Sequence, residues 1–154
     1  MTHSARIAIS AAMLALAWTM PAHAAPSDSS SMIVYKSPTC GCCGAWAALM
    51  ERAGFKVEVR DTEDMDTVKN MAFIRDELQA CHTARFGDYL VEGHVPVNAV
   101  RRMLSERPAI RGIAVPGMPH GAPGMGDDAT VRYTVYTLAN SALAKRIIYQ
   151  QIGE

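Results

Sequence analysis

Three cysteines stand within four residues of this chain, in the Cys-Gly-Cys-Cys segment at residues 40–43. Residues 32–35 form a compact apolar run that is typical of a β-strand, and residues 37–41 are predicted to form a turn. After them, apolar residues recur at helical spacing as far as residue 53. A Cys-x-x-Cys pair between a first strand and a first helix predicts an α/β protein with a thioredoxin-like fold, in which a central mixed sheet is flanked by helices.

Strands and helices continue to alternate along the rest of the chain. Residues 55–59 place apolar side chains at every second position, which predicts a second strand with one buried face. An apolar stripe over residues 64–80, preceded by the capping residue Thr62, predicts a long second helix, and residues 81–87 are expected to form a loop. Beyond them we expect strands at 89–91, 110–115 and 131–138, a helix from Pro96 to Pro108, and a final strand or short helix at 145–151.

The N-terminal residues have the pattern of a secretory signal peptide. Arg6 precedes an uncharged apolar run over residues 7–20, and residues 22–24 form a small-x-small cleavage site. The run is shorter than a membrane span, which needs roughly 20 apolar residues. We therefore expect a periplasmic protein that is cleaved after Ala24 and keeps no membrane span. The expected organisation is a signal peptide at 1–24, a disordered leader at 25–31, a thioredoxin-like domain at 32–138 and a C-terminal extension at 139–154.

Charge and length narrow the range of functions. The 15 Lys and Arg residues balance the 15 Asp and Glu residues, so the chain lacks the basic excess expected of a nucleic-acid-binding protein. The 154-residue chain, even without residues 1–24, is long enough to bury a core without disulfide bonds. The cysteines are therefore not needed for bulk stability, which favours a chemical role for them.

The four cysteines, Cys40, Cys42, Cys43 and Cys81, are compatible with three kinds of chemistry. They can form structural disulfides, for which four cysteines allow three pairings. Cys40 and Cys43 alone can act as a dithiol–disulfide pair, which gives Cys42 and Cys81 no part in the reaction. All four can bind a soft metal ion. The density of thiols at a helix N-terminus, where the helix dipole stabilises thiolates, favours this third interpretation.

Copper(I) is the metal that this donor set favours, because thiolate and thioether ligands select soft ions. The segment 116–128 is too rich in proline and glycine for a regular element, and it carries Met118, His120 and Met125. Met118 and Met125 are candidate thioether ligands, or else flexible surface residues. Four thiolates on one monovalent ion leave excess negative charge, so a polynuclear cluster in which Cu(I) ions share sulfurs is the more favourable hypothesis. The methionines on helical stripes are expected in the core: Met50, Met65, Met71 and Met103.

Two histidines lie close to these motifs in the sequence. His94 comes just before the third predicted helix and is a candidate ligand, with a capping or other polar role as the alternative. His82 directly follows Cys81 and ranks lower, because adjacent residues rarely bind one ion together unless the chain is extended.

Four ordered blocks of sequence are similar to the motifs of a known family. The blocks are Tyr35-Lys36-Ser37-Pro38-Thr39-Cys40-Gly41-Cys42-Cys43, Cys81-His82-Thr83-Ala84, Glu92-Gly93-His94-Val95-Pro96 and Val115-Pro116-Gly117-Met118-Pro119. Together they resemble the CopG family of periplasmic copper-resistance proteins, formerly a domain of unknown function. The resemblance implies a thioredoxin-like fold, copper binding through the four cysteines and a role in copper tolerance, with a change of copper oxidation state as a proposed activity.

We therefore expect residues 32–138 to bind copper. The expected metal ligands are Cys40, Cys42, Cys43, Cys81, Met118, His94 and Met125. The expected function is sequestration or redox handling of copper, and a binding protein is favoured over an enzyme. The alternative is a thiol–disulfide oxidoreductase in which Cys40 is the nucleophile and Cys43 the resolving thiol. The expected partners are copper ions and other periplasmic copper-resistance proteins, without nucleic acid.

Overall fold

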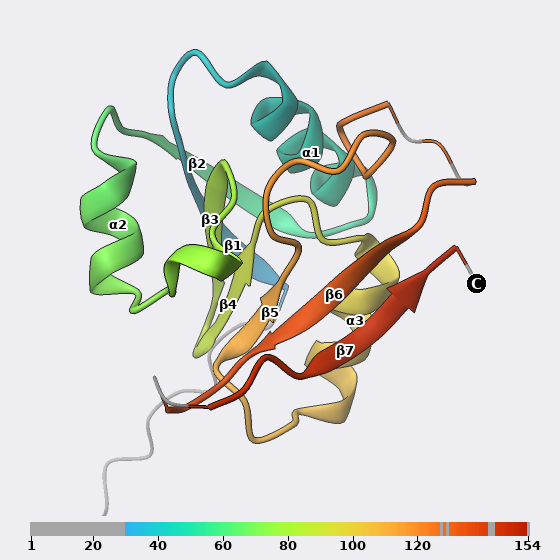
Figure 1. Ribbon diagram of the computed structural model, residues 1–154. Coiled ribbons are helices and arrows are strands. Elements are labelled where there is room, and N and C mark those ends of the chain that lie inside the picture. The colour runs from blue at the N-terminus through green and yellow to red at the C-terminus, as the bar shows by residue number, and fades with distance from the viewer. Residues whose placement is uncertain (1–29, 127, 129, 142–143, 154) are drawn as a thin grey trace, which may run out of the picture.

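The computed structural model describes residues 30–126, 128, 130–141 and 144–153, and a seven-stranded sheet forms its centre (Figure 1). The strands are β1 (Ser31–Lys36), β2 (Lys56–Asp61), β3 (His82–Phe86), β4 (Tyr89–Glu92), β5 (Gly112–Ala114), β6 (Tyr133–Leu138) and β7 (Ile148–Ile152). The helices are α1 (Gly41–Arg52), α2 (Met65–Met71) and α3 (Val97–Glu106), and a short 3-10 helix spans Asp76–Leu78. The expected signal peptide at 1–24, and all but the last two residues of the expected leader at 25–31, lie outside the described residues.

The sheet has the order β2-β1-β3-β4-β5-β6-β7 and mixes parallel with antiparallel pairs, which confirms the prediction of a mixed α/β protein. β1 runs parallel to β2, while β3 runs antiparallel to both β1 and β4. β5 is parallel to β4, and β6 and β7 follow as antiparallel neighbours. The expected C-terminal extension at 139–154 thus contributes β7, which closes one side of the sheet (Figure 1).

Apolar clusters bury both faces of the sheet. Trp46 of α1 and Met103 of α3 belong to one cluster, and Ile74, which follows α2, belongs to the other. Successive strand residues point to opposite faces, and within β5 Ile113 belongs to the first cluster while Ala114 belongs to the second. α1 and α3 therefore cover one face, and the segment after α2 covers the other.

The predicted helix over residues 64–80 is wrong in its length. Asp64, rather than Thr62, caps it by accepting a hydrogen bond from a backbone N–H of the first turn. The helix ends at Met71, and Phe73 adopts a left-handed backbone with a φ of 49° that turns the chain away. Met71 is consequently 75% exposed instead of buried in the core as predicted.

The predicted loop over residues 81–87 is also wrong, because most of it forms β3 in the interior of the sheet. Its neighbours β1 and β4 pair with its backbone on both sides. Four of its five residues are buried, and Arg85 is the exposed one. A strand buried on both faces lacks the alternation that marks a half-buried strand, so its sequence does not identify it.

The remaining elements follow the predictions, with ends shifted by a few residues. β2 is an edge strand and is less buried than expected, since Val59 is 42% exposed. Segment 116–126 forms no helix or strand, as predicted. In the part of the chain that the structure describes, no helix is both long enough and apolar enough to cross a bilayer.

Candidate metal centre

Three of the four cysteines lie at the start of α1. Cys40 is the N-cap residue, and its Sγ accepts a hydrogen bond from the backbone N–H of Cys43 at 3.3 Å. Cys40 and Cys43 are joined by a disulfide with their Cα atoms 5.4 Å apart, while Cys42 and Cys81 are free thiols. Because Cys40 has no thiol proton in this state, the Cys42 thiol is the donor in the 3.5 Å contact between their Sγ atoms.

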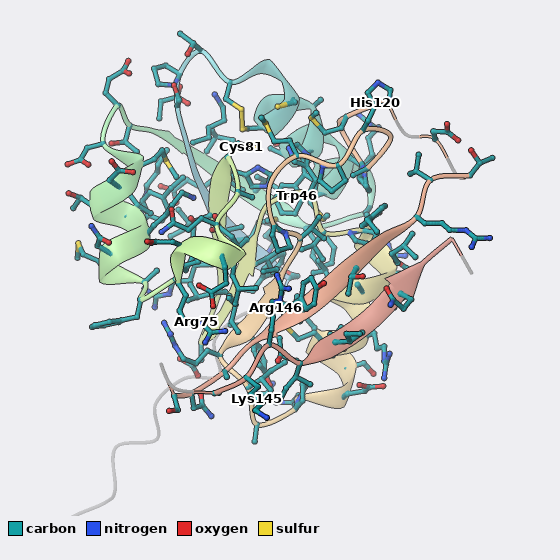
Figure 2. The ribbon with its side chains drawn as sticks, viewed as in Figure 1. Trp46, Arg75, Cys81, His120, Lys145 and Arg146 are labelled. Carbon is teal, nitrogen blue, oxygen red and sulfur yellow. A yellow bond between two sulfur atoms is a disulfide. The ribbon has the colours of Figure 1, made fainter. Side chains whose placement is uncertain are left out.

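The fourth cysteine arrives from a distant part of the sequence. Cys81 directly precedes β3, whose first residue, His82, pairs with Lys36 at the end of β1. This register brings Cys81 beside the start of α1 (Figure 2). The four cysteine Sγ atoms all lie within 4.8 Å of one another. The structure therefore gathers all four of the predicted cysteine ligands in one place.

Two buried histidines adjoin Cys81 and form a second group with it. Cys81 Sγ lies 3.0 Å from His94 Nε2 and 3.5 Å from His82 Nδ1. His94 Nδ1 is 2.8 Å from the carbonyl oxygen of Pro123, which can only accept a hydrogen bond. His94 therefore carries its proton on Nδ1, and the lone pair on Nε2 faces the Cys81 thiol.

Burial governs the protonation of this group. Burial, reinforced by the neighbouring Cys42, raises the pKa of Cys81 to about 12. Burial also lowers the pKa of His82 well below its ordinary value, and it lowers the pKa of His94. The metal-free centre at neutral pH thus holds a Cys81 thiol beside two neutral imidazoles. A metal ion must displace the thiol proton, whereas the imidazole lone pairs are already available.

The donor set fits a soft metal ion. Sulfur-rich ligand sets select Cu(I), and imidazole nitrogen is also a copper ligand. His82 Nε2 is buried and has no hydrogen-bond partner among the described residues. Buried polar atoms without partners are rare in native proteins, so this nitrogen is a candidate donor to a metal ion.

The loop that follows β5 pairs with the segment just before Cys81. The backbone N–H of Gly117 donates to the carbonyl of Gln79 at 2.9 Å, and Gly117 forms a parallel β-bridge with Ala80. Met118 and Cys81 are therefore the next residues along two paired segments. The Met118 side chain is 58% exposed, so its thioether is accessible at the surface.

The same loop continues across the first turn of α1. A Cβ added to Gly124 would lie 2.9 Å from both the carbonyl oxygen of Cys42 and the backbone nitrogen of Trp46, so only glycine permits this approach. Met125 follows and is half-buried, while His120 is exposed. The ligand roles of Met118 and Met125 stay predictions.

A buried ion pair lies between α2 and β4, and no sequence pattern marks it. Lys69 Nζ is 2.6 Å from Glu92 Oε1, and the two side chains are 6% and 0% exposed. Burial raises the pKa of Glu92, and the Lys69 charge opposes that rise.

The sequence pattern also does not reveal that His82 lies beside Cys81 and His94. Residues 81–87 are expected to form a loop, whereas His82 is the first residue of β3. An extended chain at His82 is the signal that would have favoured it as a candidate ligand.

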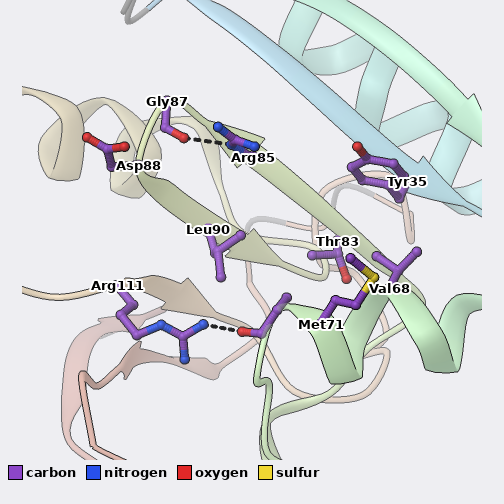
Figure 3. Close-up of a pocket in the computed structure, with 10 residues that line it drawn as sticks. Tyr35, Val68, Met71, Thr83, Arg85, Gly87, Asp88, Leu90 and Arg111 are labelled. Carbon is purple, nitrogen blue, oxygen red and sulfur yellow. Dashed lines mark hydrogen bonds between the residues drawn. The ribbon is translucent and has the colours of Figure 1, made fainter.

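A separate cavity of about 470 Å³ opens beside α2 (Figure 3). Tyr35 and Leu90 line it together with the charged side chains of Arg85 and Arg111. The Arg111 guanidinium donates to the carbonyl of Ala72 at the end of α2. The lining residues include no cysteine or histidine, so this cavity is distinct from the metal centre.

Comparison with known proteins gives a consistent result. The family model described as "Protein of unknown function, DUF411" matches residues 78–125, which include Cys81, His94, Met118 and Met125. The solved structure of copper resistance protein CopG, form 1, is 34% identical with a TM-score of 0.73 and covers 80% of this chain and 98% of that chain. Form 2 is 34% identical with a TM-score of 0.72 and covers 79% and 96%. A search of curated proteins found no match.

The likeness extends over nearly the full length of the solved relatives and combines sequence identity with a shared backbone. The blocks that suggested the family include all four cysteines, which the fold collects within 4.8 Å. The chain therefore belongs to the CopG family of copper resistance proteins.

Proposed function

We propose that this protein is a periplasmic copper-binding protein that sequesters Cu(I) through a thiolate site and so contributes to copper resistance. The observation that carries the proposal is the gathering of four cysteine Sγ atoms within 4.8 Å of one another. The residues involved come from α1 and from the segment before β3, so the cluster is a product of the fold. The solved relatives are named for copper resistance, which supports copper as the metal.

The proposed ligands are those expected from the sequence. Cys40, Cys42, Cys43 and Cys81 supply thiolates, His94 supplies Nε2, and Met118 and Met125 supply thioethers from the covering loop. Use of all four thiolates requires reduction of the Cys40–Cys43 disulfide, in which two electrons and two protons convert the bond into two thiols. Several Cu(I) ions that share sulfurs offset the negative charge of four thiolates, so we propose a polynuclear site.

Anaerobic titration of the reduced protein with Cu(I), against a chromogenic chelator, tests this proposal. We expect more than one copper per chain, and we expect Cys42→Ser and Cys81→Ser each to lower the stoichiometry or the affinity. Ser105→Ala, on the exposed side of α3, serves as the matched control and should leave both unchanged. Saturation at one copper per chain would reject the polynuclear site, and failure to compete with the chelator would reject copper binding.

The disulfide itself favours a second candidate function, thiol–disulfide exchange. Cys40 lies at the N-cap of α1 and is already paired with Cys43, as the two cysteines of such a catalyst must be. The same pair can also reduce copper. Two thiols convert two Cu(II) to two Cu(I) and release two protons as the disulfide forms. An insulin-reduction assay separates exchange from copper binding. Turnover that survives Cys42→Ser and Cys81→Ser would favour the oxidoreductase.

Further proposals concern the fold and the location. The elements β1-α1-β2-α2-β3-β4-α3, with the strand order β2-β1-β3-β4, support a thioredoxin-like unit to which β5, β6 and β7 are added. We propose that residues 1–24 are a signal peptide cleaved after Ala24, and that the domain at 32–138 meets other periplasmic copper-resistance proteins. N-terminal sequencing of the exported protein tests the cleavage site.

A further inference from the structure

The buried ion pair between α2 and β4 makes more contacts than a simple pair. Lys69, Thr83 and Glu92 are 5%, 2% and 0% exposed. Glu92 Oε1 accepts hydrogen bonds from Lys69 Nζ at 2.6 Å and from the backbone N–H of Ala80 at 2.7 Å. Glu92 Oε2 accepts from the hydroxyl of Thr83 at 2.6 Å. All three partners are donors, so a carboxylate is the group that satisfies them together.

These hydrogen bonds fall on both sides of the Cys81–His82 dipeptide. Ala80 precedes it and Thr83 follows it, so the two oxygens of one carboxylate hold both of its ends. Glu92 itself stands two residues before His94 in the chain. One side chain therefore links the segment that carries Cys81 and His82 to the segment that carries His94.

The two segments are in close contact at Gly93, where no space remains for a side chain. The N–H of Gly93 donates to the carbonyl of His82 at 2.9 Å. A Cβ on Gly93 would lie 2.5 Å from both the Ala80 Cβ and the Val115 carbonyl oxygen. The segments have no room to shift toward each other, and the Glu92 hydrogen bonds keep them from moving apart.

We propose that Glu92, with Lys69 as its counter-charge, is a positioning residue that sets the distance between Cys81 Sγ and His94 Nε2 for copper binding. The inference rests on the proposed copper site. Stability alone is a weak reason for such a pair, because replacing a buried ion pair by apolar residues of similar volume is often neutral or stabilising. The structure assigns the pair a geometric role, because the Glu92 hydrogen bonds fix the chain on both sides of Cys81 and His82.

The test uses the double variant Lys69→Met/Glu92→Leu, which removes both charges. We expect it to fold but to bind Cu(I) about 10- to 100-fold more weakly, the usual effect of losing a group that orients a metal ligand. In the copper-free protein, the ¹⁵N shift of His94 Nε2 should move because the hydrogen bond from Cys81 is lost. Met103→Ala, a core change in α3, should lower the unfolding midpoint while leaving the copper affinity and the His94 shift unchanged.

Conservative variants complete the design. Lys69→Met/Glu92→Gln keeps an acceptor for Ala80 and a polar group toward Thr83, so it should recover most of the copper affinity. If the Leu double variant does not fold, Thr83→Val removes only the Oε2 contact and should weaken copper binding several-fold. Wild-type affinity together with an unchanged His94 shift, in the folded Leu double variant or otherwise in Thr83→Val, would overturn the inference. The His94 shift is measured without copper, so it judges the positioning role even if the wild-type protein fails to bind the metal.

Discussion

Replacing Gly93 by alanine tests the close packing next to the metal centre. Gly93 has a φ of +72°, and a side chain in this left-handed region costs roughly 1–2 kcal/mol. The new Cβ would also lie 2.5 Å from the Ala80 Cβ and from the Val115 carbonyl oxygen, neither of which belongs to a flexible side chain. Such overpacking typically costs about 1–3 kcal/mol. Gly93→Ala should therefore lower the free energy of unfolding by about 2–5 kcal/mol in total.

Gly54→Ala is the matched control for this change. Gly54 has a φ of +93°, and a Cβ there finds nothing within 4 Å, so only the backbone cost of roughly 1–2 kcal/mol applies. Urea unfolding of the copper-free variants, followed by circular dichroism, measures both losses. The extra loss of unfolding free energy in Gly93→Ala measures the cost of the contacts that the added Cβ makes with Ala80 and Val115. Equal losses in the two variants would refute the argument that these segments are packed to their limit.

Three further predictions concern pH, a buried hydrogen bond and the metal. Burial lowers the pKa of both His82 and His94 below the ordinary value of 6.5, so the unfolded chain binds protons more readily than the folded one below that pH. The free energy of unfolding should fall on acidification from about pH 7.5 to about 5.5, and equal stability at both would contradict this. Trp46→Phe removes the donor to the Val95 carbonyl at 2.8 Å and should cost about 1–3 kcal/mol in urea unfolding; a loss within error would show that the carbonyl finds another donor. Free Cu(I) at about 100 times its Kd should add about 2.7 kcal/mol to the free energy of unfolding of the reduced protein, and a chelator should reverse the gain. A midpoint that copper leaves unmoved would count against a site present only in the folded state.

The sequence identifies the first half of the centre because that half is local. A strand, a turn and a helix surround Cys40, Cys42 and Cys43, and each element has its own sequence signal. No local sequence signal places Cys81 beside these three cysteines, because its position depends on the pairing of β3 with β1. The number of thiols and the resemblance to a family both include Cys81 in the predicted site, but neither shows how the fold brings it to the other three cysteines.

The errors have physical causes of two kinds. The second helix ends early because Phe73 takes a left-handed backbone, which an apolar stripe does not reveal. The sequence pattern does not indicate β3, because an interior strand is buried on both faces and loses its alternation. Because the pattern predicts a loop there, it does not show that His82 lies beside Cys81 in the folded chain. The ion pair of Lys69 and Glu92 joins two distant segments, so only the folded chain displays it.

The spacing of the proposed ligands along the chain implies an order for folding and metal binding. Cys40 and Cys43 stand three residues apart and meet within one helical turn, whereas Cys81 and His94 reach them only through β-sheet pairing. In an unfolded chain, bringing such separated groups to one ion carries the entropy cost of closing long loops. The folded sheet already holds these groups together, so metal binding to the folded chain does not carry this entropy cost. Assembly of the complete proposed site should therefore follow folding, because in the unfolded chain only Cys40, Cys42 and Cys43 lie close together.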